Sequence, residues 1–344
     1  MKVGIINVTG YSGVELARIL HRHPEAELVA VTGRSSAGKK LGEVFPHLSA
    51  IDLTITEELQ DSVDIVISAL PQTASAERLA PIIEQGIPAI DISADFRLKN
   101  VDEYKAWYKI DHPCPQYLES AVFGLPELNR KEVAGAKLIA NPGCYSTAVI
   151  LALAPAIKSG IIEPDIVADC KSGVSGAGRS ASLGTLYSEV NENVMAYSVE
   201  GHRHLPEVIQ ELGRVSSGSP PQITLLMHLI PMTRGILVSC YAKLKEGKIT
   251  GGEQGRSEVR SIYSDFYKNE PFVQVASDPP QTKQTLGSNT CRIFTTVDLR
   301  TNRFIAIACL DNLVKGAAGQ ATQNMNLMFD LPETMGLEQL ALFP

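Results

Sequence analysis

Over its first 141 residues this chain alternates short apolar runs with amphipathic segments. The apolar runs predict strands over 2–7, 27–32, 63–70 and 89–92, and the amphipathic segments predict helices over 14–22 and 74–85. The run 63–70 is almost entirely apolar, which is typical of a strand covered on both faces of a parallel sheet. Strand–helix alternation of this kind favours a Rossmann-type doubly wound α/β domain with a parallel sheet.

A glycine-containing turn joins the first predicted strand to the first predicted helix. It reads Asn-Val-Thr-Gly-Tyr-Ser-Gly over 7–13 and is similar to a dinucleotide-binding loop, with Asn7 where the first glycine usually stands. Asparagine is a tolerable substitute because it enters the left-handed conformation more readily than most residues. Glycines in such a turn let the backbone approach a pyrophosphate at the helix N-terminus. We therefore predict cofactor contacts from Thr9, Gly10, Tyr11, Ser12, Gly13 and Val14.

The end of the second predicted strand indicates which dinucleotide binds. Domains specific for NAD usually place an acidic residue there to hold the ribose hydroxyls. This chain has no acidic residue over 31–40 and has Arg34, Ser35 and Ser36 instead, followed by two lysines. Basic and hydroxyl side chains suit a 2′-phosphate, so we predict that these three residues bind NADP, as NADPH. The alternative is a solvated basic loop.

The second half of the chain predicts a different architecture. Apolar and β-branched runs predict long strands over 222–230, 236–244, 291–299 and 303–310, with one long helix over 253–267. This pattern favours an α+β domain with a mostly antiparallel sheet and helices on one face. Near the C-terminus, Asp311 and Asn312 are expected to cap a helix that runs to about Met328 and packs against the first domain.

These patterns divide the chain into two domains. Residues 1–144 and 312–344 are predicted to form the NADP-binding domain, and residues 145–311 the catalytic and oligomerisation domain. The broad apolar strands of the second domain make a homodimer or a homotetramer plausible.

A cysteine stands at the junction of two predicted elements. Cys144 follows a strand that ends at Asn141 and precedes an apolar helix predicted over 145–157. A thiol at this position faces unpaired backbone N–H groups and the positive end of the helix dipole, which stabilise the nucleophilic thiolate. The same N–H groups can stabilise an oxyanion. We therefore predict that Cys144 is a catalytic nucleophile and not a buried structural cysteine.

Two later segments carry polar chemistry. Residues 171–179 read Lys-Ser-Gly-Val-Ser-Gly-Ala-Gly-Arg, a composition that suits either a phosphate-contacting loop or a flexible linker. Residues 200–207 bring together two histidines, an arginine and two glutamates. Histidine is the side chain best matched to proton transfer near neutral pH, so this segment predicts an acid–base group. Zinc is the alternative, but a His-x-His pair lacks further obvious ligands.

Charge and cysteine usage exclude several classes of protein. The net charge is -7, and the chain has no basic patch of the kind that neutralises nucleic-acid phosphates. The six cysteines are scattered without a Cys-x-x-Cys pair, which argues against structural zinc and against a disulfide framework. The N-terminus shows no signal-peptide pattern, and the longest apolar run, 148–157, is too short for a membrane span. We expect a cytoplasmic protein without nucleic-acid or membrane partners.

Several strings, in order along the chain, together resemble the N-acetyl-gamma-glutamyl-phosphate reductase family, a relative of aspartate-semialdehyde dehydrogenase. Any one string could arise by chance, but their order and spacing make the resemblance specific. Asn7 is the clear departure from the family pattern, and it bears on cofactor affinity. The matching strings are 9–13, 91–98, 123–128, 141–145, 172–179, 202–207, 231–235 and 311–320.

The resemblance implies an enzyme of arginine biosynthesis, an NADP-dependent phosphorylating aldehyde dehydrogenase. It would reduce N-acetyl-glutamyl 5-phosphate to N-acetyl-glutamate 5-semialdehyde and release phosphate. Cys144 would displace the phosphate and form a thioester, which NADPH would then reduce. His204, or else His202, would transfer the proton, and Glu207 would orient one imidazole. No metal would be required.

The resemblance also implies binding residues. The acyl-phosphate substrate would contact Arg97, Asn141 and Arg203. The remaining contacts to the cofactor would come from Leu70, Pro71, Ser172, Gly173, Ser175, Gly176 and Asn312.

Two other functions remain open from the sequence. The same fold could act on the six-carbon N-acetyl-aminoadipyl phosphate of lysine biosynthesis, or on a related intermediate borne by a carrier protein. The chain could also be a catalytically inactive NADP-binding regulatory protein, although it keeps both Cys144 and the His-Arg-His segment.

Overall fold

The computed structural model describes residues 1–60, 62–218 and 220–344. The chain forms two compact units. The first unit contains Met1–Gly143 and Ala317–Gln339, and the second contains Cys144–Gly316 and Leu340–Pro344. Residues 312–316 and 340–344 therefore group with the second unit, whereas the sequence analysis assigned them to the first. A backbone hydrogen bond from Leu342 N to Leu286 O ties the C-terminal segment to the second unit.

The first unit is built on a parallel sheet, as predicted. Among the described residues its strand order is β2-β1-β3-β4-β6-β5, and every pairing is parallel. The strand β3 is buried along its whole length, which explains its almost continuous apolar sequence. The strands are β1 (Lys2–Ile6), β2 (Glu27–Val31), β3 (Ile65–Ser68), β4 (Ala89–Asp91), β5 (Val122–Phe123) and β6 (Leu138–Ala140).

Helices α1 and α3 of the first unit match predicted helices, α10 matches the second half of the helix predicted to end at about Met328, and α2, α4 and α5 were not predicted. The helix α1 begins three residues earlier than expected because Gly10, with an extended backbone, serves as its N-cap. The helices are α1 (Tyr11–Leu20), α2 (Leu41–Val44), α3 (Ser75–Glu84), α4 (Val101–Tyr108), α5 (Pro126–Ala134) and α10 (Gly319–Met328), the last of which packs against α1 and α5.

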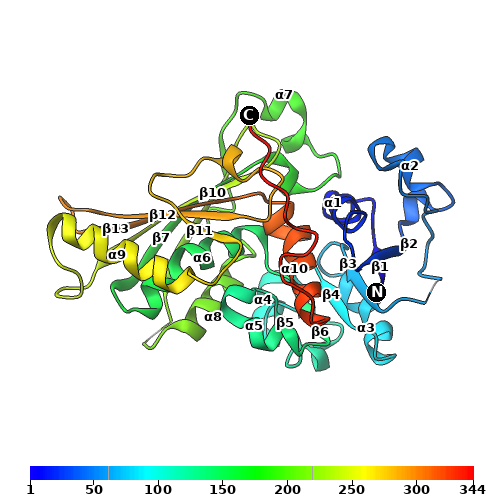
Figure 1. Cartoon of the computed structure of the whole chain (residues 1–344), viewed down its shortest axis with the longest axis horizontal. Helices are drawn as coiled ribbons and strands as arrows, with labels where there is room; N and C mark the ends of the chain where they lie inside the picture. Colours follow the sequence, from blue (N-terminus) through cyan, green and yellow to red (C-terminus); the bar gives the residue numbers. More distant parts are fainter. Residues whose placement is uncertain (61, 219) are drawn as a thin grey trace. The chain divides into compact units, whose positions relative to one another are not determined.

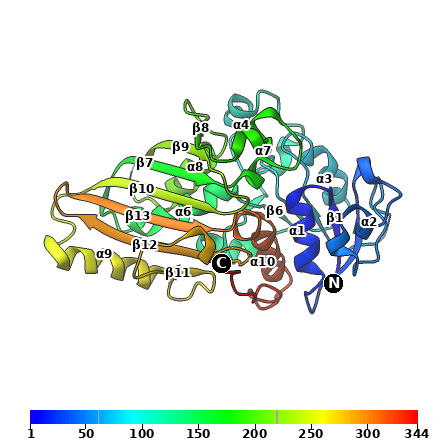
Figure 2. The ribbon, with the colours of Figure 1, turned by 90° about the horizontal axis from the view of Figure 1, so that it is seen from above.

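The second unit contains a mixed sheet with the order β11-β12-β13-β10-β7-β9-β8. Its pairings within the described chain are antiparallel except for β11 with β12 and β7 with β9, so the prediction of a mostly antiparallel sheet is confirmed. Figure 2 shows β7, β9, β10, β12 and β13 side by side. The strands are β7 (Ile162–Ser172), β8 (Met195–Tyr197), β9 (Gln222–Leu229), β10 (Ile236–Leu244), β11 (Val273–Val275), β12 (Cys291–Asp298) and β13 (Arg303–Leu310).

Helices cover one face of this sheet, as expected (Figure 1). Side chains of β12 alternate between buried and half-buried, so the other face stays partly open. The amphipathic helix α8 was not predicted, although its Pro206 lies in the first turn, where proline is tolerated. The helices of the second unit are α6 (Cys144–Lys158), α7 (Tyr187–Val190), α8 (Leu205–Val215) and α9 (Gly252–Tyr267). Within the described ranges, no helix has the length and apolarity needed to cross a membrane.

The predicted helix from Asp311 to Met328 is wrong in its first half. Residues Val314–Ala318 form a π-helix, and the α-helix α10 begins only at Gly319. The carbonyl oxygen of Asp311 accepts the backbone N–H of Gly316, five residues later, which is the spacing of a π-turn. Asp311 does cap this segment, because its carboxylate accepts the backbone N–H groups of Leu313 and Val314.

Candidate active site

The loop after β1 has the geometry that a dinucleotide site requires. Asn7 has a φ of 65°, the left-handed conformation that was expected of an asparagine at this position. Its side-chain amide donates to the carbonyl of Ala69, the residue that follows β3, at 2.9 Å. Strand order reverses between β1 and β3, and ligands of doubly wound sheets bind at such a point.

At Gly13 the loop has no space for any side chain. A Cβ atom there would lie 2.5 Å from the carbonyl oxygen of Asn7 and 2.7 Å from Cα of Val8. At Gly10 the nearest atom would be 3.7 Å away, which is ordinary contact. Within the described chain no side chain caps α1, so its first-turn N–H groups are available to an anion. The residues of this loop therefore fit a pyrophosphate.

Replacing Asn7 with Val should destabilise the first unit. A β-branched residue is strained at a φ of 65°, and the bond to Ala69 is lost, so we expect a loss of about 1–3 kcal/mol in unfolding free energy. Asn7→Gly, which keeps the conformation accessible, is the matched control. Chemical denaturation measures both variants, and equal stability of Asn7→Val and the parent would contradict the argument.

The residues predicted to select the cofactor lie after β2 on the surface. Arg34–Ser36 form a short 3-10 helix in which Arg34 and Ser35 are exposed and Ser36 is half-buried.

The loop after β3, which contains Leu70 and Pro71, is stabilised by a carboxylate. Asp95 accepts the backbone N–H groups of Thr73, Ser75 and Ala76 at 2.6–3.0 Å.

A neighbouring carboxylate reinforces that support. The buried Asp91 accepts hydrogen bonds from the hydroxyls of Ser75 and Ser93. Burial and the charge of Asp95 raise the pKa of Asp91 to about 6. The string 91–98, singled out in the sequence, thus fixes the backbone beside the expected cofactor position.

Two residues predicted to bind substrate make internal contacts in the first unit. Arg97 is buried and donates to the carbonyl oxygens of Asn141 and Ile92, both at 2.8 Å. The side chain of Asn141 is fully buried, donates to Ala317 O and accepts from Asn324. These contacts hold the backbone at the end of β6, and substrate binding by Arg97 and Asn141 stays a prediction.

Cys144 is the first residue of α6 and is half-buried. The other five cysteines are buried. Burial raises the pKa of Cys170, Cys240 and Cys309, which keeps those thiols protonated. Accessible thiol chemistry in the described chain is therefore concentrated at Cys144.

His202 and His204 lie in an aromatic cluster with Tyr145, the residue after Cys144. Rings of His202 and His204 have centroids 4.6 Å apart, and the ring of Tyr145 lies 5.7 and 6.0 Å from them. The hydroxyls of Tyr145 and Tyr197 are 3.0 Å apart. Burial raises the pKa of Tyr197 to about 12, which keeps its hydroxyl protonated.

Hydrogen bonding distinguishes the two imidazoles. His202 Nδ1 accepts the backbone N–H of His204 at 3.1 Å, so protonating that nitrogen would break the contact. His204 precedes α8, and its Nε2 lies 3.9 Å from the carboxylate of Glu207, a residue with 1% of its surface exposed. This arrangement favours a neutral His202 and a His204 that can gain a proton next to a carboxylate.

The loop that begins at Ser172 is tightly fixed. Ser172 ends β7, and Val174–Ala177 form a short 3-10 helix. A Cβ atom on Gly173 would lie 2.8 Å from Arg234 N, whereas one on Gly176 would meet the hydroxyl of Ser172 at 2.9 Å. The structure thus argues against a flexible linker, and phosphate contact by this loop stays a prediction.

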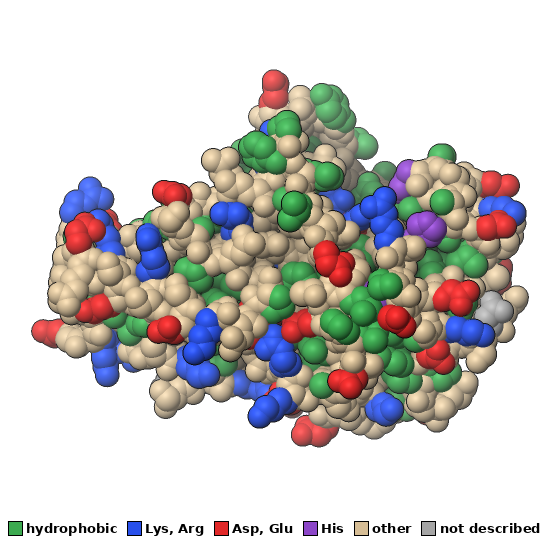
Figure 3. Space-filling view, viewed as in Figure 1, with side chains coloured by type: hydrophobic (Ala, Val, Ile, Leu, Met, Phe, Trp, Pro, Cys, Tyr) green, Lys and Arg blue, Asp and Glu red, His purple; other side chains and the backbone are tan. Residues whose placement is uncertain are grey.

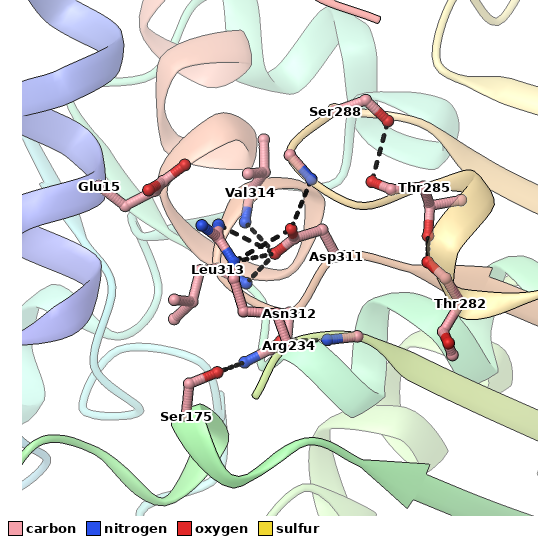
Figure 4. Close-up of polar contacts among 12 residues, drawn as sticks. Glu15, Ser175, Arg234, Thr282, Thr285, Ser288, Asp311, Asn312, Leu313 and Val314 are labelled. Carbon is pink, nitrogen blue, oxygen red and sulfur yellow. Dashed lines mark hydrogen bonds and ion pairs between the residues drawn. The ribbon is translucent and has the colours of Figure 1, made fainter. Parts of the chain in front are cut away.

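Asn312, predicted to bind the cofactor, bonds to two loops of the protein. Its Oδ1 accepts from Gly235 N at 2.8 Å, and its Nδ2 donates to the hydroxyl of Ser175 at 3.0 Å (Figure 4). Cofactor contact by Asn312, as by Ser172, Gly173, Ser175 and Gly176, stays a prediction. Arg203 is exposed at the start of the histidine segment.

The sequence analysis missed four residues of this region: Tyr145, Tyr197, Arg234 and Asp311. Tyr145, Arg234 and Asp311 belong to strings quoted for the family resemblance, which was the available signal. Tyr197 stands in no such string. A search of the described ranges finds no group of three or more His, Cys, Asp or Glu side chains arranged to hold a metal ion.

Two family models match the chain. The model described as "Semialdehyde dehydrogenase, NAD binding domain" matches residues 2–136, and "Semialdehyde dehydrogenase, dimerisation domain" matches residues 144–312. The first unit is therefore of a kind that binds a nicotinamide dinucleotide.

Solved structures share the fold. Aspartate semialdehyde dehydrogenase II from Vibrio cholerae has a TM-score of 0.71 at 18% identity, over 96% of this chain and 98% of that one. Aspartate semialdehyde dehydrogenase from Candida albicans, solved with NADP, has a TM-score of 0.69 at 16% identity, over 95% and 98%. At these identities the likeness concerns the fold alone.

Curated relatives are much more similar in sequence. The N-acetyl-gamma-glutamyl-phosphate reductase of Dehalococcoides mccartyi (strain CBDB1) is 55% identical over 343 residues, which cover 100% of this chain and 99% of that protein. The reductase of the same name from Pelotomaculum thermopropionicum is 50% identical over 352 residues, with 100% and 99% covered. This chain belongs to the N-acetyl-gamma-glutamyl-phosphate reductase family.

Proposed function

We propose that this protein catalyses the NADPH-dependent reduction of N-acetyl-glutamyl 5-phosphate to N-acetyl-glutamate 5-semialdehyde in arginine biosynthesis, with release of phosphate. The single observation that carries the proposal is the half-buried Cys144 at the start of α6, next to the tyrosine that packs on His202 and His204. The names of the relatives at 50–55% identity supply the substrate.

The first step is nucleophilic displacement at Cys144. The thiolate attacks the acyl carbon, a C–S bond forms, and the C–O bond to phosphate breaks, so that inorganic phosphate leaves with the electron pair. The first-turn N–H groups of α6 stabilise both the thiolate and the oxyanion that forms on the acyl oxygen. The product is a thioester on Cys144.

The second step needs a proton. When bound, the dinucleotide supplies the hydride that reduces the acyl group. His204 would donate a proton to the oxyanion that the reduction leaves on the acyl oxygen, and would take the proton back as the C=O bond of the aldehyde forms and the C–S bond breaks, so that Cys144 departs as a thiolate. The buried carboxylate of Glu207 stabilises the charged imidazole of His204 before transfer, and His202 holds the backbone of His204 through its Nδ1.

Cofactor selection rests on the surface loop after β2. Arg34, with Ser35 and Ser36, would hold the 2′-phosphate, since a guanidinium and hydroxyls suit a phosphate better than they suit a ribose hydroxyl. The residues 9–14 would hold the pyrophosphate on the N-terminus of α1.

Arg34→Ala should weaken NADPH binding by about tenfold or more and leave NADH binding within about twofold, because it removes one charge-assisted contact of about 1.5–3 kcal/mol. Arg22→Ala, which removes an exposed arginine elsewhere in the first unit, is the control. Fluorescence titration with both cofactors measures the constants. Equal losses for NADPH and NADH would show that Arg34 does not recognise the 2′-phosphate.

A turnover assay with two acyl phosphates tests the proposed function. N-acetyl-glutamyl 5-phosphate should be reduced at least tenfold more efficiently, in kcat/KM, than N-acetyl-aminoadipyl phosphate, in line with one methylene of pocket discrimination. The relatives named above carry the five-carbon substrate in their names and so do not support the six-carbon one. Preference for the longer substrate would overturn the proposal. No turnover with either substrate would favour a catalytically inactive regulatory protein.

We also propose that the second unit pairs with a second copy of this chain. The open face of its sheet carries apolar side chains, among them Val167, which is 39% exposed. Leu183 and Tyr187, just before and within α7, are 73% and 80% exposed. Figure 3 shows hydrophobic side chains gathered at the top of the view, where Figure 1 labels α7. Exposed apolar side chains that lie together are typical of an interface. Analytical ultracentrifugation should give a dimer or a tetramer, and a monomer at micromolar concentration would overturn the proposal.

A further inference from the structure

The carboxylate of Asp311 gathers three segments of the second unit (Figure 4). It is fully buried and pairs with the guanidinium of Arg234 at 3.1 Å. It also accepts the backbone N–H groups of Gly287, Leu313 and Val314 at 2.7–3.2 Å. A buried carboxylate with this many donors is strongly held, because each contact would be costly to leave unmade. Asp311 is therefore a rigid anchor point.

The next residue, Asn312, joins the loop of Ser172 to the loop of Arg234. Asn312 bridges the backbone of Gly235 and the hydroxyl of Ser175. The N–H groups of Val174 and Ser175 in turn bond to Met232 O and Thr233 O. The dipeptide Asp311-Asn312 thus holds the loop of Ser172 and the loop of Arg234 in one fixed arrangement.

The π-turn that starts at Asp311 ends against the nucleophile. The carbonyl oxygen of Asp311 accepts Gly316 N at 2.9 Å, which closes the turn. A Cβ atom on Gly316 would lie 2.7 Å from Cβ of Cys144 and 3.3 Å from its Cα. Gly316 therefore packs directly against Cys144, with no space between them for a side chain. Single π-turns in helices are frequently found at functional sites.

We propose that Asp311 is a positioning residue for Cys144, which acts through the π-turn Val314–Ala318 and through Gly316. The turn holds the thiol against the first-turn N–H groups of α6 at the position that attack requires. This inference rests on the proposed function, in which Cys144 is the nucleophile. Nothing in it requires Asp311 to touch substrate or cofactor.

The first test adds a side chain at the contact between Gly316 and Cys144. Gly316→Ala adds a methyl group where only 2.7 Å is available, so Cys144 or the turn must move. A displacement of about 1 Å can cost about 100-fold in rate, and we expect kcat to fall by that order while KM changes less than about threefold. Gly135→Ala is the control, since an added Cβ there meets no atom of the described residues within 4 Å.

The second test leaves the volume unchanged. Asp311→Asn removes the charge that pairs with Arg234 and replaces one acceptor oxygen with a donor, which loosens the turn. We expect kcat to fall by about 10- to 100-fold. We also expect the pH midpoint for alkylation of Cys144 by iodoacetamide to rise, with alkylation at pH 7 about tenfold slower. Asp298→Asn is the control, because Asp298 also pairs with an arginine, Arg300, on the surface of the same unit.

The alkylation profile separates positioning from simple stabilisation. The result that supports the inference is a shifted profile and a lowered kcat in protein that remains folded by circular dichroism. Wild-type alkylation and wild-type kcat per folded molecule, in both Gly316→Ala and Asp311→Asn, would overturn it. Failure of the proposed function would look different, because Cys144→Ser would then retain turnover, and that result would overturn both.

Discussion

Cys144→Ser is expected to lose at least about 1,000-fold in turnover while it binds NADPH as the parent does. A serine hydroxyl is a far weaker nucleophile at neutral pH than a thiolate, because its pKa is far higher than that of a thiol. The expected contacts at residues 9–14 and 34–36 belong to the first unit, and none of the expected contacts to the cofactor involves the side chain of Cys144. Steady-state kinetics and cofactor titration measure the two properties separately.

Cys114→Ser supplies the matched control for that experiment. Cys114 is buried in the first unit, and its Sγ contacts the carbonyl of Ala76, a bond that a serine hydroxyl can also make. Burial raises the pKa of the Cys114 thiol, which keeps it protonated and unreactive. We expect Cys114→Ser to retain turnover. Wild-type turnover in Cys144→Ser would rule out covalent catalysis at this residue.

His204→Asn should lower kcat by about two to four orders of magnitude, the usual contribution of a general acid–base group. Asparagine keeps a polar side chain of similar size but cannot transfer a proton. The effect belongs in kcat, because His204 is assigned to the step that follows acylation. Stopped-flow measurement of phosphate release should show that acylation survives in this variant.

His202→Asn is the comparison that tests the assignment. His202 holds the backbone of His204 through Nδ1, so its loss should perturb catalysis by a smaller factor, about tenfold. A large loss in His202→Asn together with full activity in His204→Asn would reverse the two roles. Full activity in both would remove the segment from the mechanism.

The parallel sheet could be predicted from the sequence because its signals are local. The apolar run that became β3 and the glycine turn that precedes α1 each lie within about ten residues. The left-handed conformation of Asn7 could be predicted for the same reason, since φ is a property of one residue. The helix α8 was missed although its segment is amphipathic and its Pro206 lies in the first turn, where proline is tolerated.

The anchor at Asp311 could not be predicted in the same way. Its partners Arg234 and Gly287 are distant in sequence, and only the folded second unit brings them together. The π-turn is also invisible to a pattern search, because Gly316, Ala317 and Ala318 suit an α-helix equally well. Gly316 also lies against Cys144, a residue that is distant from it in sequence, so a local pattern cannot reveal this contact.

Burial explains why Arg97 and Asn141 are harder to assign than the cysteine. Both were assigned to the substrate through the family resemblance, Arg97 because a guanidinium can hold a phosphate or a carboxylate. In the structure Arg97 donates to backbone carbonyls, and Asn141 donates to a backbone carbonyl and accepts from Asn324. A polar residue in a family string can thus support the site from within the fold, and sequence alone does not distinguish the two roles.

The most direct test of the account is to trap the acyl enzyme. The protein is mixed with N-acetyl-glutamyl 5-phosphate without any dinucleotide, quenched in acid, and digested for peptide mass analysis. The account predicts release of about one equivalent of phosphate per chain and an N-acetyl-glutamyl group on the peptide that contains Cys144, both absent in Cys144→Ser. Active enzyme that releases no phosphate and carries no acyl group on Cys144 would contradict it.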